Sequence, residues 1–234
     1  MSMLAIITAR GGSKRIPKKN IKEFLGKPII AYSIETAINS GAFDEVMVST
    51  DSEEIAEVAR KYGASVPFFR SSETSNDFAT TADVLAEVVE KYKEIGKEFD
   101  YIACIYPTAP FVTAKKLETA AKMLAESDAD SLMPVVRFGF PPQRALAVRD
   151  GLLAFEKPEY ALARSQDLEP LYHDCGQFYF LRTSSFAEQH ALIMKKTIPY
   201  EMPEEEVQDI DNYSDWNMAE LKYKMFIEEN DGEQ

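Results

Sequence analysis

The sequence predicts an α/β fold built on a mostly parallel sheet, with one inserted β-hairpin. Short, continuous apolar runs alternate along the chain with amphipathic segments of about ten residues or more. This alternation is typical of right-handed β-α-β units, in which helices bury both faces of the strands. The 234 residues, 45% of them hydrophobic, suffice for one domain with a large core, so we expect a single domain over residues 1–234.

The expected strands are apolar runs, and the expected helices carry apolar side chains at a spacing of three and four. Pro28 suits the first turn of the first helix, Gly41 follows its end, and Asp51 and Ser52 precede the second helix as capping residues. We expect strands over residues 3–8, 45–50, 100–106, 131–138 and 176–181, a short extended segment over 65–69, and helices over 28–39, 53–62, 81–95, 114–127 and 215–229.

Residues 138–174 interrupt the alternation of strands and helices. They begin with Pro141-Pro142 and contain Asp150-Gly151 between two apolar runs, which is a hairpin signal. An irregular polar segment follows the hairpin. We expect this excursion to leave the sheet, where it could cover a substrate or form a subunit contact.

A glycine-containing, basic segment follows the first expected strand. Residues 9–20 include Gly11, Gly12 and Ser13, and five cations lie between residues 10 and 19 of a chain whose net charge is −13. Ligands of open α/β sheets bind at the carboxyl ends of strands, and backbone N–H groups with cations suit a polyanion such as a nucleoside triphosphate. Neither a dinucleotide fingerprint nor a Walker A motif is present. The alternative is a solvated basic loop.

Two constellations could carry the chemistry. Arg10, Lys14 and Lys19 can surround a triphosphate, while Asn20 can hydrogen-bond a ribose or phosphate oxygen. Near the carboxyl end, the alternating pair Asp209 and Asp211 places two carboxylates on one side of extended backbone, and such oxygens suit Mg²⁺. The alternative for the second carboxylate is that it, or one of the next polar residues, caps the final helix.

Composition restricts the partners. The net charge of −13 argues against a general nucleic-acid surface, and no apolar run approaches the roughly 20 residues of a membrane span. Cys104 and Cys175 form no metal-binding pattern, and a cytoplasmic protein is expected. His173 and Asp174 could serve in acid–base catalysis, although a histidine in a polar loop is more often a binding contact.

Residues 9–20 resemble the signature of the CMP-sialic acid synthetase family of cytidylyltransferases, Ala-Arg-Gly-Gly-Ser-Lys-x-Ile-Pro-x-Lys-Asn. The similarity continues through residues 48–51, 69–70, 77–81, 107–110 and 209–211 and so covers nearly the whole chain. The resemblance implies a three-layer, Rossmann-like fold of the nucleotide-diphospho-sugar transferase type. It also implies CTP and an acidic nine-carbon sugar as substrates, Mg²⁺ as cofactor, and a homodimer in which the 138–174 excursion reaches the partner's sugar pocket.

The resemblance also implies roles for individual residues. Catalysis would fall to Arg10, Lys19, Asp209 and Asp211, of which the two aspartates would bind the metal. The implied nucleotide-binding residues are Ala9, Arg10, Gly11, Gly12, Ser13, Lys14, Lys19, Asn20, Arg70, Ala79, Thr80 and Thr81. The implied sugar-binding residues are Tyr106, Arg164, His173, Gln177 and Tyr179.

The departures from the family pattern fall on the sugar side. Tyr106 stands where sialic acid enzymes usually have glutamine, and residues 174–179 read Asp-Cys-Gly-Gln-Phe-Tyr instead of an Asn-Gly-Ala-x-Tyr pattern. These residues resemble the subgroup that activates pseudaminic acid, a sialic acid-like sugar with a methyl terminus and extra acylamino groups. The alternatives are activation of N-acetylneuraminic or legionaminic acid, activation of 3-deoxy-manno-octulosonic acid (whose enzymes differ in the loop), and a nucleotide-binding module without turnover.

Overall fold

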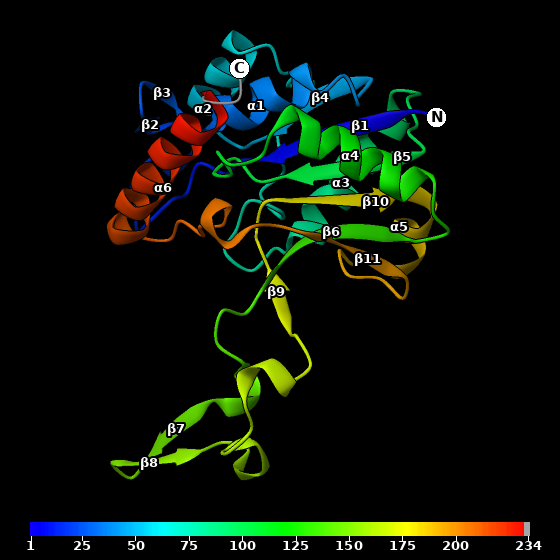
Figure 1. Ribbon diagram of the computed structural model, residues 1–234. Coiled ribbons are helices and arrows are strands. Elements are labelled where there is room, and N and C mark those ends of the chain that lie inside the picture. Colours follow the sequence, from blue (N-terminus) through cyan, green and yellow to red (C-terminus); the bar gives the residue numbers. More distant parts are fainter. Residues whose placement is uncertain (232–234) are drawn as a thin grey trace.

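A seven-stranded sheet forms the centre of the protein in the computed structural model, which describes residues 1–231, with side chains as far as residue 228. Residues 232–234 of the predicted domain therefore lie outside the described part. The strand order is β11-β6-β10-β5-β1-β4, and β9 also pairs with β6 (Figure 1). The strands are β1 (Met3–Thr8), β4 (Glu45–Ser49), β5 (Tyr101–Ile105), β6 (Ser131–Arg137), β9 (Tyr172–Asp174), β10 (Phe178–Arg182) and β11 (Thr197–Glu201).

Five strands of the sheet share one direction, and β9 and β10 run against them. β1 pairs in parallel with β4 and β5, and β6 pairs in parallel with β11. β10 lies antiparallel between β5 and β6, and β9 is antiparallel to β6. The amino end of β10 therefore lies beside the carboxyl end of β5, where Phe178 pairs with Ile105.

Helices cover both faces of the sheet and give three layers (Figure 1). Met3, Ala5 and Ile7 of β1 belong to one buried cluster, whereas the alternate residues Leu4 and Ile6 belong to another. The first cluster includes side chains of α1, α2 and α4, and the second includes side chains of α3 and α5. The predicted α/β class is confirmed, with helices α1 (Ile29–Asn39), α2 (Glu53–Lys61), α3 (Thr81–Glu94), α4 (Ala114–Ala125), α5 (Thr183–Gln189) and α6 (Tyr213–Asp231).

A third apolar cluster fixes the last helix to the start of the chain. Trp216 and Ala219 of α6 pack with Phe24 and Tyr32, and Ile16 of the basic loop joins them. Phe24 also lies in a two-stranded ribbon formed by β2 (Glu23–Phe24) and β3 (Lys27–Pro28). This packing holds residues 209–211, which precede α6, next to the basic loop, as the ion pair between Arg15 and Asp211 shows.

The sequence did not predict β11, α5 or the β2–β3 ribbon. β11 contains Pro199, which normally argues against a strand because proline cannot donate a ladder hydrogen bond. The strand lies at the edge of the sheet, where one side of the backbone needs no partner. The expected extended segment over 65–69 makes a single bridge, between Ser65 and Met47.

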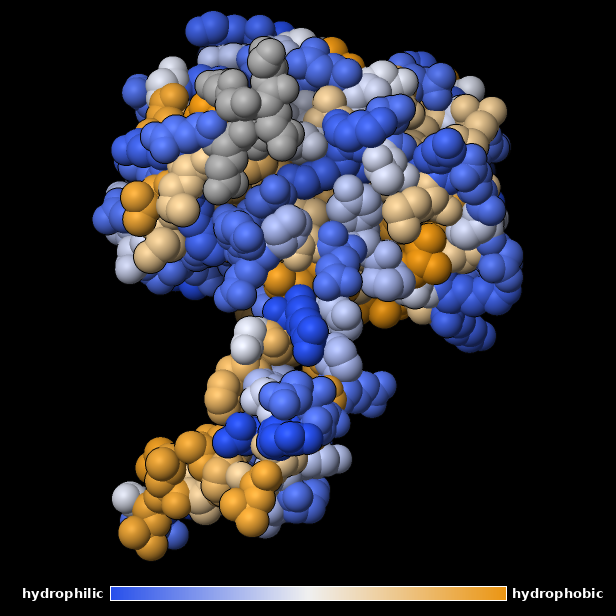
Figure 2. Space-filling view, viewed as in Figure 1, coloured by the Kyte–Doolittle hydropathy of each residue, from blue (hydrophilic) through white to orange (hydrophobic). Residues whose placement is uncertain are grey.

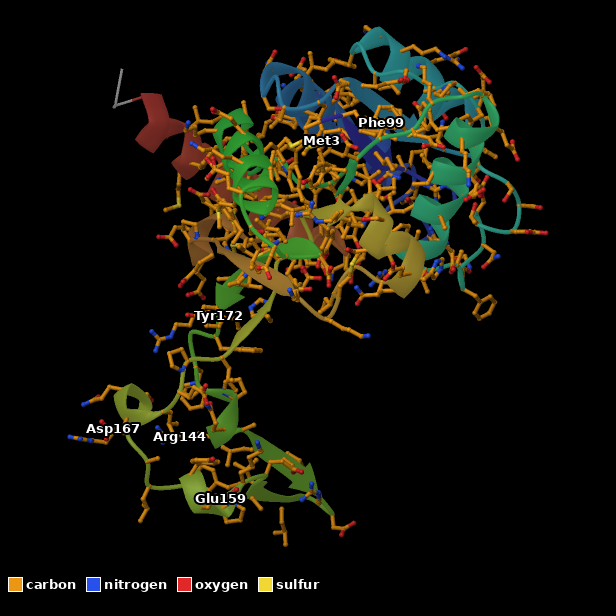
Figure 3. All side chains as sticks on the ribbon, turned by 90° about the vertical axis from the view of Figure 1, so that its right-hand side faces the viewer. Met3, Phe99, Arg144, Glu159, Asp167 and Tyr172 are labelled. Carbon is orange, nitrogen blue, oxygen red and sulfur yellow. The ribbon has the colours of Figure 1, made fainter. Side chains whose placement is uncertain are left out.

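The predicted hairpin is present in a segment that projects from the body, here called the arm (residues 138–171; Figures 1 and 3). β7 (Leu146–Arg149) and β8 (Leu152–Phe155) pair antiparallel across Asp150-Gly151. Both turn residues have positive φ, 52° and 78°, as a tight hairpin turn requires. The last three residues of the predicted 138–174 excursion form β9 and belong to the main sheet.

Within the part of the chain that the structure describes, no helix is both long and apolar enough to cross a bilayer.

Candidate functional site

A cavity of about 540 Å³ opens where β1 and β5 end. The basic loop forms one wall, and Arg70 and the start of α3 form the opposite wall. Nine of the twelve predicted nucleotide-binding residues line it, together with Tyr106 and Asp211. These nine are Arg10, Ser13, Lys14, Lys19, Asn20, Arg70, Ala79, Thr80 and Thr81.

The other three predicted residues, Ala9, Gly11 and Gly12, do not line the cavity. Ala9 is fully buried. The N–H of Gly11 donates to Asp51 Oδ1 at 2.8 Å, and a Cβ at this position would lie 3.2 Å from the Cβ of Ser52. Gly12 is exposed and has open space around it. Glycine is therefore favoured at position 11, where the loop approaches the segment after β4 closely, which accounts for a glycine that does not line the cavity.

Two internal hydrogen bonds hold the basic loop in place. Asn20 is 5% exposed, and its Nδ2 donates to the backbone oxygen of Arg10 at 2.9 Å. Lys19 Nζ donates to the backbone oxygen of Ile210 at 2.6 Å, which ties the loop to the predicted metal-binding segment. Burial lowers the pKa of Lys19, while the nearby charges of Asp211 and Asp209 oppose the shift. Asn20 thus orients the loop, and Lys19 presents a partly desolvated charge.

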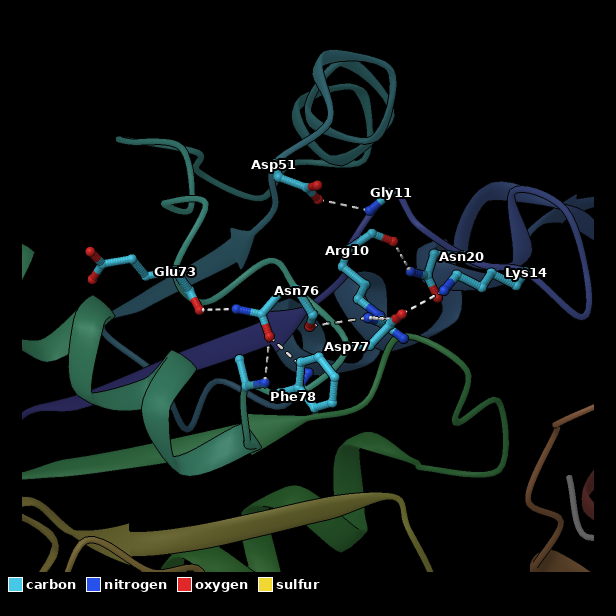
Figure 4. Close-up of polar contacts among 10 residues, drawn as sticks. Arg10, Gly11, Lys14, Asn20, Asp51, Glu73, Asn76, Asp77 and Phe78 are labelled. Atoms are coloured by element: carbon cyan, nitrogen blue, oxygen red, sulfur yellow. Dashed lines mark hydrogen bonds and ion pairs between the residues drawn. The ribbon is translucent and has the colours of Figure 1, made fainter.

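Two cations of the basic loop, Arg10 and Lys14, are held by the carboxylate of Asp77, for which no role was predicted. Asp77 Oδ1 accepts a hydrogen bond from Arg10 Nη1 at 2.7 Å, and its Oδ2 accepts one from Lys14 Nζ at 2.5 Å (Figure 4). The hydrogen bonds from Lys14 and then Arg10 lower the pKa of Asp77. The carboxylate therefore occupies the position that an anionic ligand of these cations would take. The contacts span more than 60 residues of sequence, so no local pattern indicated them.

We expect Asp77→Asn to strengthen CTP binding. The variant removes an anion that competes with phosphate for Arg10 and Lys14, and exposed ion pairs of this kind are individually weak, so Kd should fall about threefold to tenfold. Isothermal titration at low and high salt measures this, and the gain should shrink with salt. Glu73→Gln is the matched control, because Glu73 lies in the same segment and points away from Arg10 (Figure 4). Weaker binding by Asp77→Asn would contradict the expectation.

Arg70 lies on the wall opposite the basic loop. Its Nε donates to Ser49 Oγ at 3.1 Å and its Nη2 to the backbone oxygen of Ser49 at 2.7 Å, so the guanidinium is fixed at the end of β4. Burial lowers the pKa of Arg70, although a guanidinium remains charged at neutral pH. Beside it, Thr80 caps α3 through a reciprocal pair of hydrogen bonds with Asp83. The amino end of α3 therefore faces the cavity with its positive dipole end.

A second cavity, of about 500 Å³, lies on the other side of Tyr106. Tyr106 lines both cavities, and its hydroxyl lies 3.2 Å from Thr81 Oγ1 on the first side. Its ring contacts that of Tyr179 on the second side, with centroids 5.5 Å apart. Of the five predicted sugar-binding residues, Tyr106, His173 and Tyr179 line this second cavity.

The other two predicted sugar-binding residues lie elsewhere in this chain. Gln177 is 2% exposed, and its Nε2 donates to the backbone oxygen of Glu206 at 2.7 Å, so it supports the segment before Asp209. Arg164 lies on the arm, where it pairs with Asp167 at 2.7 Å. It lines neither cavity of its own subunit.

Asp209 and Asp211 lie at the boundary between the two cavities. Asp211 lines the first cavity and Asp209 the second. Desolvation, followed by the charge of Asp211, raises the pKa of Asp209, so a cation between the two would be favoured. Among the described residues no group of three or more His, Cys, Asp or Glu side chains could hold a metal. Two carboxylates completed by phosphate and water are nevertheless a donor set that suits Mg²⁺.

The alternative that Asp211, or Asn212 or Ser214 after it, caps the final helix is confirmed for Asn212 and not for Asp211. Asn212 Oδ1 accepts from the N–H groups of Ser214 and Asp215, and Asp215 Oδ2 accepts from the N–H groups of Asp211 and Asn212. These residues satisfy the first turn of α6. The Asp211 carboxylate instead pairs with Arg15 at 2.7 Å and faces the first cavity.

Comparisons with known proteins agree with this architecture. Residues 4–229 match a family model described as cytidylyltransferase. The chain is 40% identical to a pseudaminic acid cytidylyltransferase of Campylobacter jejuni, over 96% of this chain and 97% of that protein. It is 32% identical to a CMP-N,N'-diacetyllegionaminic acid synthase of Legionella pneumophila, over 94% and 95% of the two chains.

A solved structure extends the comparison to the fold. The structure of CMP:2-keto-3-deoxy-manno-octonic acid synthetase complexed with CTP matches with a TM-score of 0.66 and 17% identity, over 97% of this chain and all of that one. The predicted Rossmann-like nucleotidyltransferase fold is thereby confirmed. With a family model over nearly its whole length and a relative of 40% identity over 96% of the chain, the chain belongs to the cytidylyltransferase family and is a nucleotidyltransferase.

Proposed function

We propose that the protein activates pseudaminic acid, converting CTP and this sugar to CMP-pseudaminic acid and pyrophosphate. The observation that carries the proposal is the pair of adjoining cavities, one basic and one mainly aromatic and acidic, with Asp209, Asp211 and Tyr106 between them. A nucleotide in the first cavity and a sugar in the second would meet at this boundary. The relatives named pseudaminic acid cytidylyltransferase support the choice of sugar.

In the reaction, the anomeric hydroxyl of the sugar attacks the α-phosphorus of CTP and pyrophosphate leaves. Such a transfer needs positioning and charge neutralisation more than covalent chemistry from the protein. Arg10, Lys14 and Lys19 would bind the triphosphate, and Lys19 would offset charge on the transferred phosphoryl group. The hydrogen-bond donors of Arg70 and of the amino end of α3 would hold the cytidine, because they line the same cavity as the basic loop.

We further propose Mg²⁺ as the cofactor, with Asp209 and Asp211 as its protein ligands. When bound there, the ion would supply positive charge next to the α-phosphate and the sugar's reacting end. The rise in the pKa of Asp209 supports this assignment, because desolvation and then the charge of Asp211 disfavour its charged form in the absence of a cation. The charge of Lys19 opposes this rise but does not cancel it, and Arg15 pairs with Asp211.

The arm supports a homodimer. Its exposed apolar side chains form an orange patch at the tip (Figure 2), where Val148, Leu152 and Leu153 are 72%, 74% and 64% exposed and Leu162 is 97% exposed. So much apolar surface on a projecting segment indicates a protein contact. A second copy of this chain would cover it, and Arg164 could then reach the partner's sugar cavity and pair with the sugar carboxylate.

The proposed role of the arm in dimer formation can be tested with the double variant Leu152→Lys and Leu153→Lys. We expect a monomer by light scattering and a fall in kcat/KM for the sugar of about 100-fold or more, because Arg164 no longer reaches the partner's site. CTP binding should be retained, since the first cavity lies in the body. Ile193→Lys, at a side chain 64% exposed outside the arm, is the control for added surface charge. A fully active monomer would contradict the proposal.

We place the enzyme in the cytoplasm, where CTP is made, and expect neither nucleic acid nor a membrane as partner. The net charge of −13 supports the expectation about nucleic acid, because phosphate backbones would be repelled outside the basic loop.

The proposed function is tested by pyrophosphate release from CTP and Mg²⁺ with pseudaminic, N,N'-diacetyllegionaminic and N-acetylneuraminic acids in parallel. Preference for pseudaminic acid is the expected result. Preference for either of the others would keep the reaction and change the sugar. CTP binding without release with any sugar would instead favour a nucleotide-binding module.

A further inference from the structure

Residues 207–211, which carry the two proposed metal ligands, form neither a helix nor a strand. A helix or strand fixes its backbone through its own hydrogen bonds, so the position of this segment depends on other partners. Three long side chains from other parts of the fold donate to backbone oxygens at or next to the segment. They are Lys19 of the basic loop, as described above, Gln177 and Lys222.

Gln177 lies directly before β10 and is 2% exposed. Its Nε2 donates to the backbone oxygen of Glu206 at 2.7 Å, and its own backbone oxygen accepts the N–H of Tyr106 at 2.8 Å. Tyr106 lines both cavities, and Glu206 lies three residues before Asp209. One buried residue therefore joins the boundary between the cavities to the backbone that leads into the carboxylate pair.

The other atom of the Gln177 amide group does not stabilise the fold. Its Oε1 is buried and has no hydrogen-bond partner among the described residues. A buried acceptor without a partner is unfavourable, and an apolar side chain of similar length would avoid that penalty. Local choices that disfavour stability are expected at functional sites. This pattern favours a role for the Nε2 donor in the site.

Lys222 holds the same segment from α6. Its Nζ donates to the backbone oxygen of Val207 at 2.8 Å and to that of Glu204 at 3.2 Å. An ammonium group has three donors, so it can serve both oxygens at once. Since Trp216 packs α6 against the basic loop, this contact fixes the segment relative to the loop that borders the first cavity.

We propose that Gln177 and Lys222 are positioning residues for the cation site, because they hold the backbone before Asp209 and so set its carboxylate and that of Asp211 for Mg²⁺. This inference rests on the metal assignment within the proposed function. Mg²⁺ demands near-ideal octahedral geometry, and two protein carboxylates supply only part of its coordination. A shift of the segment therefore weakens binding of the ion even though both carboxylates are still present.

The experiment measures Kd for CTP by titration calorimetry, with a chelator and with Mg²⁺, in the absence of sugar so that no turnover occurs. The ratio of the first Kd to the second reports how far the ion strengthens nucleotide binding. We expect Gln177→Met and Lys222→Met each to lower this ratio about threefold to tenfold, because methionine keeps the side-chain length but donates no hydrogen bond. Kd with the chelator should stay within about twofold of the wild-type value, since neither residue lines the first cavity.

Each variant has a matched control. Gln143 of the arm is also buried, its Nε2 donates to the backbone oxygen of Glu169 at 2.8 Å, and its Oε1 has no partner among the described residues. Gln143→Met therefore removes the same kind of contact away from the site. Lys224→Met is the control for lost charge on α6, because Lys224 is exposed and lines neither cavity. Both controls should keep the wild-type ratio.

A merely structural role predicts a lower melting temperature with an unchanged ratio, so that result in Gln177→Met or Lys222→Met overturns the inference for the residue concerned. An equal fall of the ratio in the matched control also overturns it. Lys222→Arg, which still donates to the backbone, should recover most of the loss. Should Gln177→Met not fold, Lys222→Met and Lys222→Arg still test the inference.

The wild-type protein separates this inference from the proposed function. A wild-type ratio of one would overturn the metal assignment, and with it the inference, before any variant is compared. Pyrophosphate release with the sugars tests the proposed reaction independently of that ratio. A wild-type ratio above one that is unchanged in both variants overturns the inference alone.

Discussion

Asp209→Asn should lower kcat by a factor of about 1,000 or more, which corresponds to about 4 kcal/mol of transition-state stabilisation. The variant keeps the shape of the side chain but replaces the carboxylate that we propose as a Mg²⁺ ligand with an amide. Activity titrated against Mg²⁺ should need more metal and stay low at saturation. Removal of divalent metal with a chelator should abolish the activity of the wild-type enzyme, and added Mg²⁺ should restore that activity.

The fold should survive this substitution. Desolvation and then the charge of Asp211 raise the pKa of Asp209, so loss of its charge removes both of these costs. We expect an unchanged or slightly higher melting temperature. Asp215→Asn provides the contrast, because Asp215 Oδ2 accepts two N–H groups at the start of α6, and its loss should lower stability more than activity. Near-wild-type turnover by Asp209→Asn in Mg²⁺ would contradict the metal assignment.

Lys19→Met should lower kcat about 100-fold to 1,000-fold, as expected when a preorganised charge on a reacting phosphoryl group is removed. Lys19 Nζ is held by the backbone oxygen of Ile210 and lies near both aspartates. Since methionine preserves the buried length of the side chain, the loss should appear in turnover more than in CTP affinity. A stopped-flow measurement of single turnovers separates these two effects.

The pKa of Lys19 gives this prediction a second readout. Burial lowers the pKa of Lys19, so the side chain loses its proton, and with it the charge that the proposed mechanism uses, at a lower pH than an exposed lysine would. The basic limb of the kcat profile should therefore lie at a lower pH than an exposed lysine would give. Lys19→Arg should move that limb to higher pH, because a guanidinium stays protonated. A profile that is identical in both proteins would show that Lys19 does not set it.

Local patterns made most of the nucleotide side predictable. The features that indicate an anion-binding loop are contiguous in sequence. They are the apolar run of β1, the glycine at position 11 and the cations between residues 10 and 19. These features depend on short-range geometry, which residue type largely determines. The turn over residues 79–81 was predicted only from the resemblance, and the structure adds that Thr80 caps α3 there.

The rest depended on contacts between distant residues. The ion pairs of Asp77 join segments more than 60 residues apart, and the inward turn of Gln177 depends on the backbone of Glu206. β11 was missed because Pro199 is tolerated only where the fold leaves an edge. The contact proposed for Arg164 is also a long-range one, because it would be made with a second copy of the chain.

The reversed direction of β10 brings a separate stretch of chain to the second cavity. Because the amino end of this strand lies beside Ile105, the segment that enters it reaches the reaction boundary from the opposite side to the nucleotide loops. Residues that line the first cavity come mainly from the first 108 positions, whereas the second cavity draws mainly on positions 173–209. Grafting residues 172–180 from a relative with another acceptor could therefore redirect sugar choice without rebuilding the site for CTP. A family with this topology can diversify its products by changing one short stretch of chain.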